Sequence, residues 1–162
     1  MAKLSKIKSF LDKELKIKLI KDISKNGLQV KANKEIKKIG FAVDGSLSTF
    51  EKAKQQNVDL LIVHHGIKWK KQKYPELAKK KEKFLSKNNI SLYGVHLPLD
   101  AHGKYGNNIE LCNALNLDKI RKFGDYHGSK IGYSGIFKKD TNINEISKIL
   151  NKKLKTKCNV LN

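Results

Sequence analysis

The sequence predicts an α/β fold in which βαβ units form a mixed, mostly parallel sheet with helices on its faces. Three short apolar runs end on polar residues at positions 44, 64–65 and 96, and segments with helical periodicity lie between them. Alternation of strand, helix and strand is typical of right-handed crossovers between parallel strands. Because the runs are apolar throughout, we expect their strands to be covered on both faces.

An amphipathic helix is expected to open the chain, because Leu4, Ile7, Leu11 and Leu15 recur at helical spacing. No internal repeat and no linker longer than a loop is recognisable, so we expect a single α/β lobe over residues 1–162. The further elements are expected in this order: a strand at 37–44, a helix at 46–56, a strand at 58–65, a helix at 75–87, a strand at 90–96, a helix at 106–117, two strands between 119 and 137, and a helix after Asn142.

Two of these helices have recognisable start signals. Ser48 and Glu51 have the spacing of a capping box, in which each side chain satisfies a free backbone N–H of the first turn. Asn142 precedes the last helical pattern and is expected to cap it.

The composition is strongly basic, with a formal net charge of +20. Such a charge favours an anionic partner, and weak nucleic-acid binding without sequence preference is one expectation. Biased codon usage explains the same excess, because the lysines are scattered and Arg121 is the single arginine. Arginine is the usual residue for bidentate recognition of bases and phosphates, so a dedicated reader of base sequence is disfavoured.

The chain has the character of a cytoplasmic protein. No stretch approaches the roughly 18 consecutive apolar residues of a membrane span, so no membrane partner is expected. Lysines interrupt the N-terminal segment, which therefore lacks the apolar core of a secretory signal. Cys112 and Cys158 form no CxxC pair and are interpreted as reduced thiols, with Cys112 in the core.

Polar side chains follow each of the three predicted parallel strands. Asp44 ends the first, His64 and His65 end the second, and His96 ends the third, with Asp100 four residues later. The carboxyl ends of parallel strands meet at one edge of a sheet, where ligands bind in open α/β folds. Imidazole and carboxylate together are typical ligands of borderline divalent metals. The sequence therefore predicts a metal site at this edge.

Each residue also has a plainer interpretation. Asp44 precedes a glycine and is typical of a turn, and His96 can hold the turn before Pro98. Adjacent side chains on a strand point to opposite faces, so His64 and His65 would share a site only if they splay at the strand end, toward two metals rather than one.

Other catalytic motifs are missing from the sequence. There is neither a phosphate-binding P-loop nor a Gly-x-Ser-x-Gly nucleophile elbow. His127 lies in a predicted turn and is expected at the surface rather than in a metal site.

Two segments carry a family resemblance. "VDGSLSTFEKAKQQNVDLLIVHHGIKW" at 43–69 and "YGVHLPLDAHGKYGNNIELCNALNL" at 93–117 resemble the Nif-three-like family, often labelled GTP cyclohydrolase one type two. The matching pattern is an Asp after the first strand, a His-His pair after the second, and His-x-Pro-Leu-Asp before Gly-Asn-Asn and a helix. The N-terminal helix and "NGLQV" at 26–30 also fit.

The resemblance implies a two-lobed α/β protein with a dinuclear metal site and a homohexameric, toroidal assembly. By position, His64, His65 and Asp100 match metal ligands, while His96 and Asp44 are expected to support them. Two divalent ions per subunit are implied for the full-length protein, with Zn, Fe, Mn and Ni as candidates. Family members continue for roughly one further lobe, which supplies another histidine and glutamate. We expect residues 1–162 to be the N-terminal lobe, without the C-terminal one.

The leading hypothesis is a divalent-metal-dependent, hydrolase-like protein that acts on an anionic or nucleotide-like substrate. Two ions would activate water and hold the substrate oxygens. The cyclohydrolase label depends on the resemblance alone, because nothing in the sequence indicates a guanine pocket. The alternative is a basic, metal-containing binding or regulatory protein with a nucleic-acid or protein partner.

Overall fold

The computed structural model describes residues 1–161, which form two compact units, residues 1–99 and the segment from Asp100 onward. Each unit has its own helices and strands, and the expectation of one lobe over residues 1–162 stays a prediction. Within the described residues, no helix has both the length and the apolar character needed to cross a membrane.

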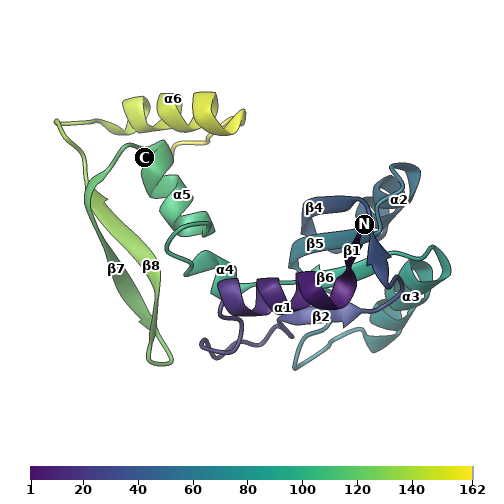
Figure 1. Ribbon diagram of the computed structural model, residues 1–162. Coiled ribbons are helices and arrows are strands. Elements are labelled where there is room, and N and C mark those ends of the chain that lie inside the picture. Colours follow the sequence, from purple (N-terminus) through teal and green to yellow (C-terminus); the bar gives the residue numbers. More distant parts are fainter. Residues whose placement is uncertain (162) are drawn as a thin grey trace. The chain divides into compact units, whose positions relative to one another are not determined.

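The first unit is built around a four-stranded mixed sheet, and the α/β prediction is confirmed (Figure 1). The strand order is β2-β6-β5-β4; β4, β5 and β6 are parallel, and β2 is antiparallel to β6. Its elements are β1 (Ala2–Lys3), α1 (Leu4–Glu14), β2 (Gly27–Val30), β3 (Glu35–Ile36), β4 (Ile39–Asp44), α2 (Leu47–Gln55), β5 (Leu60–His65), α3 (Pro75–Lys87), β6 (Ser91–Gly94) and α4 (Leu97–Asp100), which reaches the unit boundary.

Helices cover both faces of this sheet because its central strands are apolar on both sides. Leu61 and Val63 of β5 join a buried cluster with Phe50 of α2 and Leu85 of α3. The neighbouring residue Leu60 joins a second cluster with residues of α1 on the opposite face. The two-residue period of a strand thus sends alternate side chains of β5 to different helices.

The expectation that every strand is covered on both faces is wrong for β4. Ile39, Phe41 and Val43 point to one face of this edge strand, and Phe41 is 77% exposed. α1 covers other strands on this face of the sheet, because its buried residue Leu4 clusters with Leu60 of β5 and Tyr93 of β6 and with no residue of β4. Continuous apolar sequence therefore does not distinguish a central strand from this edge strand.

The helix caps show how local sequence places the elements. The predicted Ser48–Glu51 capping box is wrong. The N-cap of α2 is Ser46, two residues before Ser48, and its side chain accepts a hydrogen bond from the Thr49 backbone N–H at 3.1 Å. Ser48 consequently lies inside the first turn. The Asn142 cap is confirmed, and with Glu145 it forms a full capping box.

The second unit contains a long hairpin and two helices. Its elements are α5 (Asn107–Ala114), β7 (Asp118–Tyr126), β8 (Ser129–Ile136) and α6 (Ile143–Leu154), and β7 pairs antiparallel with β8. Asn108 of α5 donates to the Ile131 carbonyl oxygen at 2.9 Å, which ties the helix to the hairpin. As predicted, Cys112 is buried and His127 is exposed in the hairpin turn.

Candidate metal centre

Three histidines come together where β5 and β6 end. One potential ligand atom from each of His64, His65 and His96 lies within 4.8 Å of the other two. The ring centroids are 4.5 Å apart for His64 and His65, 5.0 Å for His64 and His96, and 5.5 Å for His65 and His96. These three rings, here called the histidine cluster, are half-buried in the first unit.

The parallel arrangement of the sheet produces this convergence. β5 pairs with β6 up to Val63 and Gly94, so the residues that follow leave the sheet at the same edge. His64 and His65 are the last residues of β5, and their rings approach each other although the strand period would separate them. The two adjacent rings therefore reach one site at the end of the strand, and their division between two metals stays a prediction.

Hydrogen bonds at Nδ1 orient the first two rings. His64 Nδ1 lies 3.0 Å from the Val95 carbonyl oxygen, and His65 Nδ1 lies 2.7 Å from Asp44 Oδ1. A carbonyl or carboxylate oxygen only accepts, so each ring donates its Nδ1–H. A neutral imidazole that donates from Nδ1 carries its lone pair on Nε2. Nε2 is consequently the atom through which both rings would bind a metal.

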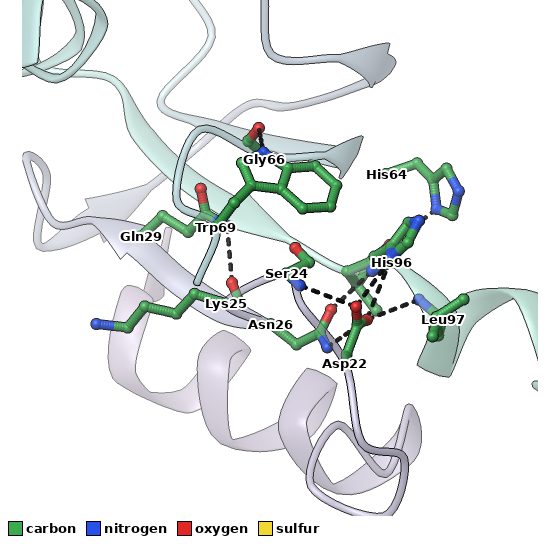
Figure 2. Close-up of polar contacts among 11 residues, drawn as sticks. Asp22, Ser24, Lys25, Asn26, Gln29, His64, Gly66, Trp69, His96 and Leu97 are labelled. Atoms are coloured by element: carbon green, nitrogen blue, oxygen red, sulfur yellow. Dashed lines mark hydrogen bonds and ion pairs between the residues drawn. The ribbon is translucent and has the colours of Figure 1, made fainter. Parts of the chain in front are cut away.

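Asp22 orients the third ring and was not identified from the sequence (Figure 2). Its Oδ1 accepts from His96 Nδ1 at 3.0 Å and from the Ser24 backbone N–H at 2.8 Å. Its Oδ2 accepts from Asn26 Nδ2 at 2.9 Å and from the Leu97 backbone N–H at 3.1 Å. The carboxylate thus fixes both the His96 ring and the chain segment that carries it.

The environment keeps Asp22 ionised even though its side chain is only 2% exposed. Burial by itself raises the pKa of the Asp22 carboxyl, but the hydrogen bonds from Asn26, Ser24, His96 and Leu97 outweigh it and leave the pKa below its usual value. A carboxylate in this position fixes the tautomer and the orientation of the imidazole that donates to it.

The loop after β5 is held in place by Gln29. Gln29 Oε1 accepts from the Ile67 backbone N–H at 2.7 Å, and a Cβ added at Gly66 would lie only 2.3 Å from Gln29 Nε2. Trp69 closes the loop by donating from Nε1 to the Gly66 carbonyl oxygen at 3.0 Å. The indole then meets His96 edge-on, with ring centroids 5.2 Å apart, and so borders the histidine cluster (Figure 2).

The two predicted carboxylates have different positions. Asp44 is exposed but contacts His65, as a supporting residue would. Asp100 belongs to the second unit, where its Oδ1 accepts from Asn107 Nδ2 at 2.9 Å. Its predicted role as a metal ligand, like those of His64 and His65, stays a prediction.

The donor set of the cluster suits a metal ion. Three imidazoles that could each offer one ring nitrogen are typical ligands of Zn²⁺ and of other borderline divalent metals. An acceptor faces every Nδ1, which is the arrangement that metal-binding histidines commonly have. The cluster therefore could hold a metal ion.

Comparison with known proteins identifies relatives across nearly the whole chain. The GTP cyclohydrolase 1 type 2 homolog of Pyrococcus horikoshii is 51% identical over 149 residues, which are 91% of this chain and 60% of that protein. The protein of the same name from Archaeoglobus fulgidus is 43% identical over 148 residues, with the same two coverages. This chain thus spans about 60% of the length of these relatives.

Solved structures give the same result for the fold. A protein from Thermus thermophilus matches with a TM-score of 0.81 and 34% identity, over 93% of this chain and 61% of that one. Reduced HcgD from Methanocaldococcus jannaschii matches with a TM-score of 0.76 and 35% identity, over 93% and 60%. The model of the Duf34/NIF3 (NGG1p interacting factor 3) family matches residues 2–162. On sequence and structure together, this chain belongs to the Duf34/NIF3 family.

Proposed function

We propose that this chain forms part of a divalent-metal-dependent hydrolase whose metal centre is dinuclear. The observation that supports it is the histidine cluster, in which every Nδ1 faces an acceptor and the ligand atoms lie within 4.8 Å of one another. Holding three imidazoles so close has a cost in side-chain entropy, which a bound ion would offset.

The proposed ligands are His64, His65 and Asp100, with His96 and Asp44 in supporting roles. Divalent ions bound at such a site activate water for attack and stabilise negative charge on substrate oxygens. Asp22 keeps His96 in one orientation, so its Nε2 can bind an ion or accept a proton at a fixed position. Zn, Fe, Mn and Ni are the candidate metals, two ions per full-length subunit.

We propose that the substrate is an anion, such as a nucleotide. Its support is the net charge of +20 and the printed name of the relatives, GTP cyclohydrolase 1 type 2 homolog. The assembly that we propose is a homohexamer in the cytoplasm. Nucleic acid would then bind only weakly and without sequence preference, because the charge is carried by scattered lysines.

The metal site can be tested with the fluorescence of Trp69, the only tryptophan in the sequence. Its ring lies 5.2 Å from that of His96 and 6.3 Å from that of His65, so a bound Co²⁺ or Ni²⁺ should quench its emission. Zn²⁺ should compete without the same quenching. Elemental analysis after dialysis gives the stoichiometry.

Substitution of the cluster supplies the decisive comparison. His64→Ala and His65→Ala should each lose quenching and bound metal, while the exposed hairpin residue His127 serves as control in His127→Asn. Asparagine suits the control position because His127 has a φ of 50°. Retention of full metal content in the cluster variants would overturn the proposal.

Hydrolysis should be assayed separately, with a panel of nucleotides and phosphate esters and with the metals added singly. Metal-dependent turnover that disappears in His65→Ala would support the hydrolase. Stoichiometric metal without turnover of any panel member would instead favour a regulatory or binding protein with a resident metal.

A further inference from the structure

A second feature of the first unit lies directly beside the histidine cluster. A cavity of about 200 Å³ is bounded by the loop after β5 and the first turns of α3. Lys71, Lys73 and Lys81 line it together with the aromatic rings of Trp69 and Tyr74. We call this cavity the lysine pocket.

The lining of the lysine pocket carries only one sign of charge. Three of its residues are lysines, and none is an aspartate or a glutamate. Lys73 Nζ lies 5.3 Å from the centroid of the Tyr74 ring, a cation–π contact that restrains one ammonium at the pocket. Glu82 of α3 lies outside the lining and is engaged by Lys68, at 3.0 Å from its Nζ. The pocket is therefore a favourable place for an anion.

Trp69 connects the lysine pocket to the histidine cluster. Its indole lines the pocket, and the same ring lies 5.2 Å from His96 and 6.3 Å from His65 between centroids. Gly66, whose carbonyl oxygen accepts from the indole N–H, also lines the pocket. The Trp69 indole is thus common to the pocket and to the border of the cluster, so a small molecule with an anion in the pocket could extend along the indole toward the cluster.

We propose that the lysine pocket binds a phosphate group of the substrate and thereby orients the reacting bond toward the histidine cluster. This inference depends on the proposed function for the identity of the reaction, but not for the binding of phosphate itself. Lysine acts as a point charge on phosphate, so three lysines supply charge without the fixed geometry that arginines would impose. Trp69 and Tyr74 provide apolar walls for the remainder of the molecule.

The experiment uses metal-free chain, kept in EDTA, so that phosphate cannot bind through a metal. Inorganic phosphate and pyrophosphate are titrated at low ionic strength, with Trp69 fluorescence and calorimetry as readouts. Lys71→Gln, Lys73→Gln and Lys81→Gln should each weaken pyrophosphate binding about fivefold, as expected for one charge close to a partly screened anion. The triple variant should show no saturable binding.

Matched controls come from the same lysine-rich helix. Lys79→Gln and Lys80→Gln remove the same charge from exposed positions of α3 that do not line the pocket. Both should bind pyrophosphate within about twofold of the unsubstituted chain, because a distant charge is largely screened. Equal weakening by controls and pocket variants would overturn the proposal and indicate a diffuse effect of net charge. Absence of saturable binding to the unsubstituted chain would also overturn it.

The failure of this inference is distinguishable from the failure of the proposed function. Quenching of Trp69 by Co²⁺ tests the histidine cluster and should be unchanged in all lysine variants. Normal metal binding with no pocket-specific phosphate binding refutes the lysine pocket alone. Pocket-specific phosphate binding without metal binding supports the pocket and refutes the metal-dependent reaction.

Discussion

Replacing Asp22 with asparagine removes one charge from the residue that holds His96, with almost no change in volume. The carboxylate accepts from Ser24 and His96 on Oδ1 and from Asn26 and Leu97 on Oδ2, and His96 Nδ1 also lies 3.2 Å from Oδ2. An amide offers only one acceptor oxygen. Whichever way it is turned, its NH₂ group faces two atoms that donate in the unsubstituted chain.

The expected cost follows from this geometry. A buried donor that loses its acceptor costs about 1–3 kcal/mol. We expect the amide to place its NH₂ group at the Oδ1 position, because there His96 can relieve one of the two conflicts by changing tautomer. The conflict with the Ser24 backbone N–H remains, so Asp22→Asn should lower the free energy of unfolding by about 1–3 kcal/mol. That change moves the proton of His96 to Nε2, the nitrogen through which this ring would bind an ion. Metal affinity should therefore fall by about 10- to 100-fold, as for other lost partners of metal-binding histidines.

Urea unfolding of metal-free chain measures the stability, and Co²⁺ quenching of Trp69 measures the affinity. Nitrogen-15 NMR of the imidazoles reports the tautomer and should show the proton of His96 transferred from Nδ1 to Nε2. The control is Asp125→Asn, because Asp125 accepts from the Gly128 backbone N–H in an exposed turn. A loss below about 0.5 kcal/mol in Asp22→Asn, no larger than a typical surface substitution, together with unchanged quenching, would refute the reasoning.

Four other predictions concern the same region of the chain and its charge. The stability that ionised Asp22 contributes is fully present above its usual pKa of 3.8 and is lost as the pH falls through its lower folded pKa, so thermal melts of Asp22→Asn and the unsubstituted chain should converge in acid. His65→Ala and Asp100→Ala should each abolish stoichiometric metal while circular dichroism stays unchanged; full metal content in either would count against its role as a ligand. Gly66→Ala should cost about 1–3 kcal/mol in urea unfolding, because the new Cβ overlaps Gln29, and a neutral result would show that Gln29 moves aside freely. Any affinity for nucleic acid should fall steeply with salt in filter-binding assays, and a sharp sequence preference would contradict this.

Residues that act through near neighbours in the chain were predictable from the sequence. The Asn142–Glu145 capping box is confirmed because both halves of the motif lie within one turn. The N-cap of α2 is Ser46 and not the predicted Ser48. Both serines lie beside the start of the helix, and the choice between them depends on where β4 ends.

The convergence of the histidines was also accessible from the sequence, because parallel strands deliver their carboxyl ends to one edge. The alternation of apolar runs and helical segments was sufficient for that expectation, and His64, His65 and His96 lie together as it requires. The sequence did not reveal the exposed face of β4, since an apolar run has the same composition at an edge as at the centre of a sheet.

Asp22 and the lysine pocket were decided only by the tertiary structure. Asp22 and His96 are 74 residues apart, and no local pattern relates a carboxylate in one loop to an imidazole after a strand formed much later in the chain. The Trp69 indole likewise joins the pocket to the cluster because residues far back in the chain hold its loop. Gln29, 38 residues before Ile67, accepts from the Ile67 backbone N–H, and Ser24 forms a β-bridge with Trp69. Periodicity and caps are short-range properties of the backbone, so the sequence by itself determined the α/β elements and the edge where the histidines meet. The partners that orient those histidines depend on long-range packing, which the folded chain alone defines.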